Sequence, residues 1–201
     1  MGRHVKRLVA LGVLCVAAGG CGSTTPAMPN PITEPAIDQP GQNIVRYRDM
    51  VIEIVLDYKH ASNSLGDEWM ILNAAMSGMT GAMTKVDRRM ISIRTPDGRS
   101  IPMPTYRKFN AAYNDLRSAA RRAALSSDPL DFTRGGRRDW MIDFFPLPGS
   151  GRSARTALNV SKNDLCVGML YFPVANGVQP GTWKLVVDFE ETRAVVPFNL
   201  E

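Results

Sequence analysis

Short segments in which apolar and polar side chains alternate recur along this sequence, separated by clusters of Gly, Pro, Asn and Asp. The clearest is residues 182–190, where every second side chain is large and apolar, namely Trp183, Leu185, Val187 and Phe189. Because successive side chains of a strand point to opposite faces, a period of two predicts a strand with one buried face. By similar reasoning we expect strands at 50–59, 68–77, 89–94, 100–103, 140–145, 168–174 and 193–200. Many short strands between turn residues predict a mainly β fold, an antiparallel β-sandwich.

One segment has the helical period instead. Residues 106–125 contain many alanines and no Gly or Pro, and their apolar side chains recur at spacings of three and four, at Phe109, Tyr113, Leu116, Ala120 and Ala123. This pattern predicts an amphipathic helix, with Thr105 as its N-cap and its end near Ser126. The helix is inserted between the two β halves, where we expect it to cover an end or edge of a sheet.

The last part of the chain carries a resemblance to a known class of domain. Residues 180–189 read Pro-Gly-Thr-Trp-Lys-Leu-Val-Val-Asp-Phe. This resembles the penultimate strand of the immunoglobulin-like domains that are common in exported bacterial proteins. The resemblance implies an immunoglobulin-like sandwich that serves as a scaffold for contacts, without implying a chemistry. The Cys–Trp–Cys core of antibody domains is absent.

The N-terminal residues have the composition of an export signal. Arg3, His4, Lys6 and Arg7 are basic, residues 8–18 are apolar, and small residues precede Cys21. A basic start, an apolar stretch of about 7–15 residues and small residues before the cleavage site are typical of a signal peptide. A permanent membrane helix needs roughly 20 apolar residues, which is more than this stretch offers. We therefore expect residues 1–20 to be a signal peptide.

The residues around Cys21 make that expectation more specific. Ala18-Gly19-Gly20-Cys21 resembles the lipobox of bacterial lipoproteins, Leu-Ala/Ser-Gly/Ala-Cys, with Ala18 in place of the usual Leu. The resemblance implies that Cys21 receives diacylglycerol and, after cleavage, a further acyl chain such as palmitate, which together anchor stably. It implies an extracytoplasmic, membrane-anchored protein of the cell envelope or periplasm. Gly22 rather than Asp would favour the outer membrane in a Gram-negative source. Ordinary secretory cleavage and an uncleaved anchor are the alternatives.

A tether is expected to follow Cys21. Residues 22–43 hold five prolines among Ser, Thr, Asn and Gln, namely Pro26, Pro29, Pro31, Pro35 and Pro40. Such a stretch buries too little apolar surface to fold and favours extended chain. We therefore expect residues 21–43 to be the lipidated cysteine with its linker, and residues 44–201 to form a single sandwich domain.

The charge of the chain limits its partners. The sequence has 24 basic and 19 acidic residues, a net charge of +5. Loss of Arg3, Lys6 and Arg7 with the leader leaves 21 basic against 19 acidic residues. An excess this small does not favour nucleic acid as a partner. The expected partner is the membrane, through the lipid on Cys21.

Metal and catalytic residues are sparse. Beyond the leader and Cys21, the chain retains one cysteine, Cys166, and one histidine, His60, which cannot make a multi-His or Cys-cluster zinc site. We predict no metal or cofactor, a buried Cys166 and a solvated His60 in a loop. Gly-x-Ser-x-Gly is absent. Asp139 and Asp143 lie four residues apart at the predicted strand 140–145, so they would share one face. They are candidates for the paired carboxylates of a glycosidase, without further support from the sequence.

Arginines gather on the predicted helix and just after it. At about 100° per residue, Arg107, Arg117 and Arg121 fall within roughly a third of the helix circumference. Together with Arg137 and Arg138 they are candidates for contact with anionic lipid headgroups, which contribute about 1 kcal/mol per basic residue. The alternative is a solvated polar face balanced by neighbouring acids.

Three functions remain open at this point. We favour a non-enzymatic lipoprotein whose sandwich binds another envelope protein or stabilises an assembly. The alternative is a binding protein for a small molecule, a metal or a glycan, and an envelope hydrolase is the least supported. A pocket with convergent polar groups would favour the ligand-binding protein. An exposed apolar patch or a long unpaired edge strand would favour the protein partner.

Overall fold

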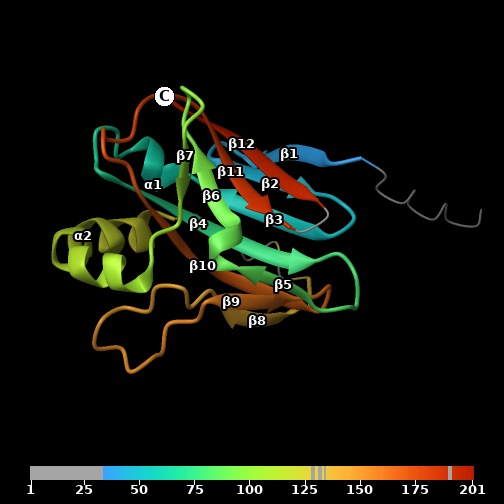
Figure 1. The fold of residues 1–201 in the computed structure, drawn as a ribbon. Coiled ribbons are helices and arrows are strands. Elements are labelled where there is room, and N and C mark those ends of the chain that lie inside the picture. The colour runs from blue at the N-terminus through green and yellow to red at the C-terminus, as the bar shows by residue number, and fades with distance from the viewer. Residues whose placement is uncertain (1–33, 128–129, 131–132, 134, 190–191) are drawn as a thin grey trace, which may run out of the picture. The chain divides into compact units, whose positions relative to one another are not determined.

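The structure of the chain is a computed structural model that describes residues 34–127, 130, 133, 135–189 and 192–201 (Figure 1). The strands are β1 (Ala36–Gly41), β2 (Ile44–Arg48), β3 (Ile52–Asp57), β4 (Trp69–Gly78), β5 (Thr84–Asp87), β6 (Ile91–Arg94), β7 (Ser100–Pro102), β8 (Arg138–Met141), β9 (Ala157–Val160), β10 (Asp164–Pro173), β11 (Gly181–Asp188) and β12 (Arg193–Leu200). The helices are α1 (Lys59–Ser62) and α2 (Tyr106–Ser126), with a short 3-10 turn, η1 (Arg88–Met90). The predicted mainly β sandwich, with one amphipathic helix inserted between its β halves, is confirmed.

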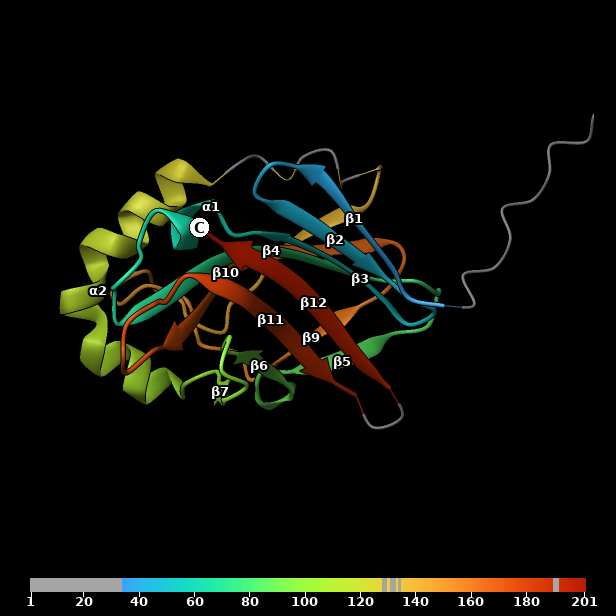
Figure 2. The ribbon, with the colours of Figure 1, turned by 90° about the horizontal axis from the view of Figure 1, so that it is seen from above.

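Two sheets make the sandwich. A six-stranded sheet has the order β1-β2-β3-β4-β10-β8, and a four-stranded sheet has the order β12-β11-β6-β7. In Figure 2, β11 and β12 lie across the strands of the larger sheet. The side chains between the sheets form the main core, in which Trp183 is fully buried and donates its indole N–H to the Gln179 carbonyl at 2.8 Å. A small third sheet pairs β5 with β9.

The larger sheet is covered on its outer face as well. The sequence predicts a strand at 50–59 with one buried face, and this part of the prediction is wrong because every residue of β3 is buried. Leu130, which follows α2, packs against Ala75 and its neighbours on that face. Arg137 places its guanidinium 2.8 Å from the Glu53 carboxylate. The alternation of polar residues in β3 therefore reflects buried, paired side chains rather than solvent on that face.

Helix α2 begins and ends close to where the sequence predicts. The Thr105 side chain caps it by accepting a hydrogen bond from the Lys108 amide at 3.2 Å. Its buried residues are Phe109, Leu116, Ala120 and Ala123, spaced three to seven apart on one face. Figure 1 shows α2 lying against one end of the sheets, as expected for an inserted helix. No helix within the described residues is long and apolar enough to cross a membrane.

Some predicted boundaries are corrected. β1 lies inside the predicted linker and pairs with β2, so ordered structure begins before Ile44. Its residues are almost all exposed, so no apolar period marks it, and Arg46 Nε donates to Asp38 Oδ1 at 2.9 Å to help hold it. The predicted strand 140–145 is instead β8, which ends at Met141. β5 and β9, each of four residues, carry too few side chains to show a period.

Candidate functional site

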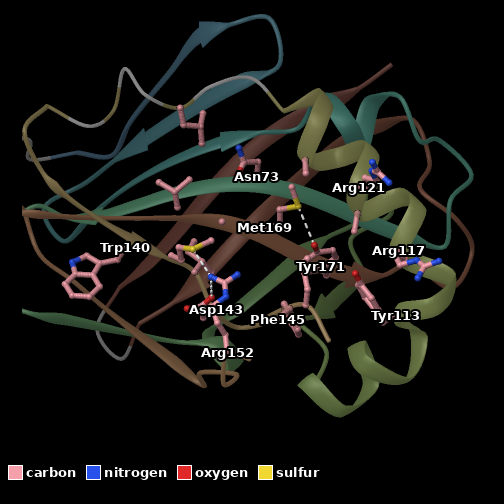
Figure 3. Close-up of a pocket in the computed structure, with 18 of the residues that line it drawn as sticks. Asn73, Tyr113, Arg117, Arg121, Trp140, Asp143, Phe145, Arg152, Met169 and Tyr171 are labelled. Atoms are coloured by element: carbon pink, nitrogen blue, oxygen red, sulfur yellow. Dashed lines mark hydrogen bonds and ion pairs between the residues drawn. The ribbon is translucent and has the colours of Figure 1, made fainter. Parts of the chain in front are cut away.

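A groove of about 1010 Å³ lies on the outer face of β4 and β10, between α2 and the segment that runs from β8 to Arg152 (Figure 3). Asn73 of β4 and Val167 and Met169 of β10 contribute to its floor. Asn73 is paired with Met169 in the register of these two strands, so both side chains point to the same face. The groove therefore lies on this outer face beside α2, and Leu130 also lines it.

One wall of the groove is a stripe of α2. Tyr113, Arg117, Ala120, Arg121 and Ala124 line it, at spacings that place them along one side of a helix. Phe109, Leu116, Ala120 and Ala123 dock α2 on the core, so the groove stripe lies beside that buried face. The amphipathic pattern of α2 thus fixes both its docking and the side chains it offers to the groove.

The opposite wall includes β8 and the residues that follow it. A Cβ atom on Gly168 would lie 2.8 Å from the Ile142 Cβ atom, a distance that real Cβ atoms do not tolerate. Glycine at position 168 therefore lets this wall pack directly on β10. Trp140, Met141 and Leu147 also line the wall and are 50 %, 59 % and 44 % exposed.

Trp140 is held in place although it is half exposed. Its indole N–H donates to Asp164 Oδ1 at 3.0 Å, and Arg138 lies 2.9 Å from the same oxygen. Hydrogen bonds from Ser161 and then Trp140 lower the pKa of Asp164 below its usual value, which keeps it ionised. In the register of β8 with β10, Trp140 pairs with Cys166 and Met141 with Val167, so the indole lies on the face away from the groove floor and Met141 on the groove side.

Aromatic side chains close one end of the groove. The ring of Phe109 stacks at 4.9 Å from that of Phe145 and at 4.8 Å from that of Tyr171, and both of these partners line the groove. Burial raises the pKa of Tyr171 to about 12, so its phenol is neutral at physiological pH. The Tyr171 hydroxyl donates to Met169 Sδ at 3.4 Å, a weak interaction that Figure 3 marks with a dashed line.

The charges in the groove are unevenly compensated. The Asp143 carboxylate and the Arg152 guanidinium are 3.0 Å apart, and Asp139 also has an interaction partner. By contrast, Arg117 and Arg121 form no ion pair with any residue that the structure describes. The α2 side of the groove therefore carries positive charge that the described neighbours leave unbalanced.

The five candidate arginines differ in their surroundings. Arg107, Arg117 and Arg121 are exposed on α2, as expected, but only the last two line the groove. Arg137 and Arg138 are paired with Glu53 and Asp164, although the Arg138 side chain is still 69 % exposed. Those acids come from strands distant in sequence, so the pairing leaves no local pattern. Contact of the exposed arginines with a lipid surface stays a prediction, and Cys21 lies outside the described residues.

The remaining candidates fall elsewhere. Cys166 is buried, as predicted, and burial raises its thiol pKa to about 11. His60 is a correction: it lies in α1, is 7 % exposed, and its Nε2 has no hydrogen-bond partner within the described residues. Asp139 and Asp143 both line the groove, but Asp143 lies beyond the end of β8. No cluster of three potential metal-ligating residues occurs in the described part of the chain.

The groove itself could not be read from the sequence, since its walls and floor come from four separate segments. The chain matches no family model, no curated protein sequence and no solved structure. A functional argument therefore depends on the geometry of the groove.

Proposed function

We propose that this chain is a membrane-anchored, non-catalytic lipoprotein whose sandwich domain binds a small ligand in the groove beside α2. The observation that carries the proposal is the groove itself, in which apolar side chains such as Val167 and Met169 lie beside polar and charged ones. Its volume of about 1010 Å³ stands at the upper end of the roughly 300–1,000 Å³ that is usual for small-ligand sites.

The exposed apolar side chains support a binding role for the same place. Eight large hydrophobic residues of the described chain are exposed, and three of them line the groove: Trp140, Met141 and Leu147. Scattered exposed hydrophobics are ordinary, whereas a contiguous group beside a concavity is typical of a binding site. A bound ligand would cover Met141, which is on the groove face of β8, and Leu147, and remove them from water.

The sheet edges favour a ligand over a protein partner that adds a strand. Of the four edge strands in the two larger described sheets, three contain a proline: Pro40 in β1, Pro102 in β7 and Pro197 in β12. The fourth, β8, has only four residues. Proline removes a main-chain donor, and short or proline-bearing edges discourage pairing with another chain. Binding of an envelope protein stays a prediction that the edges do not favour.

A non-catalytic role fits the groove chemistry. The described lining residues include no histidine and no cysteine, and both lining carboxylates have partners. A general base or an activated nucleophile needs such a group poised to take a proton. The polar groups of the groove are better suited to orienting a ligand than to reacting with it.

Groove binding can be tested with a neutral apolar dye, N-phenyl-1-naphthylamine, which fluoresces when it leaves water. Ala124→Trp places an indole in the groove, and the matched control Leu125→Trp places one on the neighbouring residue of α2, outside the lining. We expect the full chain to bind the dye, Leu125→Trp to retain binding and Ala124→Trp to lose it. Equal binding by both variants, or no binding by the parent chain, would overturn the proposal.

The anchoring part rests on the leader and the lipobox resemblance at Cys21. Acyl chains contribute about 0.8 kcal/mol per buried methylene, so two or three chains hold a protein on a membrane. We expect the wild-type chain to incorporate labelled palmitate and to sediment with membranes, and Cys21→Ser to do neither. A Cys21→Ser variant that still carries label and remains on the membrane would refute lipidation at this residue.

A further inference from the structure

We propose that the groove selects an anionic amphiphile, a molecule with an apolar body and one carboxylate head group. The head group would bind at Arg117 and Arg121 on α2, and the body would lie over Met169 towards Met141. This inference rests on the proposed ligand-binding function and adds the chemical class of the ligand.

The two arginines form the anionic subsite. They lie four residues apart on α2, which places them one turn apart on the same side, and both are exposed and line the groove. Like charges at this spacing repel, and the described residues supply no acid between them. A bound carboxylate would relieve this repulsion, and the planar guanidinium group is well suited to binding carboxylates through two N–H groups.

The opposite side of the groove has a different character. Arg152, the third lining arginine, is neutralised by Asp143 at 3.0 Å. Met141, which shares the face of Val167, and Leu147 present exposed apolar surface there. Figure 3 shows Arg117 and Arg121 on the helix and Met169 beside them, whereas the ring of Trp140 is turned away from these side chains. The groove is therefore asymmetric: the α2 side carries positive charge that the described residues do not pair, and the opposite side combines apolar surface with charges that have partners.

This polarity favours an amphiphile over two simpler partners. A small polar anion would leave the apolar floor and wall exposed to water, which costs free energy. A flat anionic membrane surface would use a broad set of arginines, but Arg137 and Arg138 are engaged by acids of the fold. An amphiphile with one carboxylate satisfies both halves of the groove.

The test compares amphiphiles of one chain length that differ only in head group. Dodecanoate, dodecanol and dodecyltrimethylammonium are titrated against the full chain with bound N-phenyl-1-naphthylamine, each below the concentration at which it forms micelles or a separate phase. The variant Arg117→Gln/Arg121→Gln removes the proposed subsite. Its control, Arg107→Gln/Lys108→Gln, removes the same charge from exposed residues of α2 outside the groove.

We expect dodecanoate to displace the dye at the lowest concentration and to lose roughly tenfold or more in affinity in the Arg117→Gln/Arg121→Gln variant, the loss typical of a charged hydrogen bond. The control should keep the preference for dodecanoate. If the dye binds but the three amphiphiles compete equally, or the arginine variant keeps the preference, the inference fails while groove binding stands. If the dye does not bind at all, the proposed function fails. Binding to anionic vesicles through Arg117 and Arg121 without dodecanoate displacement would replace the inference with a membrane contact.

Discussion

Phe109 offers the most direct test of how α2 is attached and how the groove is built. It is fully buried, and its ring lies within 5 Å of the rings of Phe145 and Tyr171, at 4.9 and 4.8 Å. Removal of a buried phenylalanine to alanine costs about 3–5 kcal/mol, a range that includes the cavity left behind. Alanine is the better helix former, which offsets at most about 0.7 kcal/mol. We therefore expect Phe109→Ala to lower the free energy of unfolding by about 3–4 kcal/mol.

The measurement is urea unfolding of the full chain followed by circular dichroism, with the change read from the midpoint at constant slope. Leu125→Ala is the matched control, because Leu125 is on the same helix and 80 % exposed, and it should change stability by no more than about 0.5 kcal/mol. If Phe109→Ala does not fold, Phe109→Leu keeps most of the volume and should cost about 1.5 kcal/mol or less. A Phe109→Ala loss close to that of the control would refute the docking of α2 through this ring.

Three further outcomes are expected. Since burial raises the pKa of the Cys166 thiol to about 11, the peptide that contains Cys166 should stay unlabelled by iodoacetamide in the folded chain and react on unfolding; labelling at the rate of free cysteine would contradict this. Burial and then the charge of Arg122 lower the pKa of His60 in the folded chain below its usual 6.5. The free energy of unfolding should therefore be highest above pH 6.5, where His60 is neutral in both states, and should fall as the pH drops from 6.5 towards the folded pKa. His60→Gln should flatten this decline in unfolding free energy between about pH 7 and 5. An unchanged pH profile would contradict the assignment of the decline to His60. Gly177 has a φ of +72°, and a Cβ atom there would lie 2.6 Å from the Gly66 carbonyl oxygen. The control Gly98→Ala, where the space is open, should lose only the roughly 1–2 kcal/mol that a positive φ costs, and Gly177→Ala should lose more. Equal losses of stability in thermal unfolding would refute the clash.

The strands that the sequence predicts best are those with one face on the core. β12 begins and ends where the alternation does, and β11 ends only two residues short of its predicted limit. Their apolar side chains face the core while most of the others do not, so the period of two is visible.

β1 is the opposite case. Its side chains are exposed on both faces, and main-chain pairing with β2 leaves no trace in the composition.

Burial by a second layer of chain is what the sequence hides most completely. Glu53 and His60 are both buried, although charge and position favoured solvent for them. Glu53 is compensated by Arg137, 84 residues later in the chain, and no local pattern connects the two. His60 is covered in part because α1 packs against α2, another contact between distant segments. A residue-by-residue estimate of exposure cannot include partners that only the fold brings near.

The same limit applies to the groove. Its residues come from β4, α2, the β8 segment and β10, and each segment alone looks like an ordinary strand or helix. The sequence did single out Arg117 and Arg121, but as part of a group of five defined by helical spacing and proximity in the chain. What it could not supply was the floor beneath them, since Met169 and Asn73 are side by side only through the pairing of β4 with β10.

The fold divides the five arginines by the acids it places beside them. Arg137 and Arg138 each meet a carboxylate that is almost fully buried, and an acid buried in that way needs a cation nearby, so these arginines serve the structure. Arg117 and Arg121 meet no such acid among the described residues and instead border an apolar concavity. Because these two arginines pair with no described acid, binding an external anion there would break no ion pair of the described fold. The sequence left two interpretations of this cluster, a solvated face and an anionic contact. At Arg117 and Arg121 the geometry contains nothing that requires a solvated face and would exclude a bound anion. The groove, rather than the whole helix surface, is therefore the place to look for an anion.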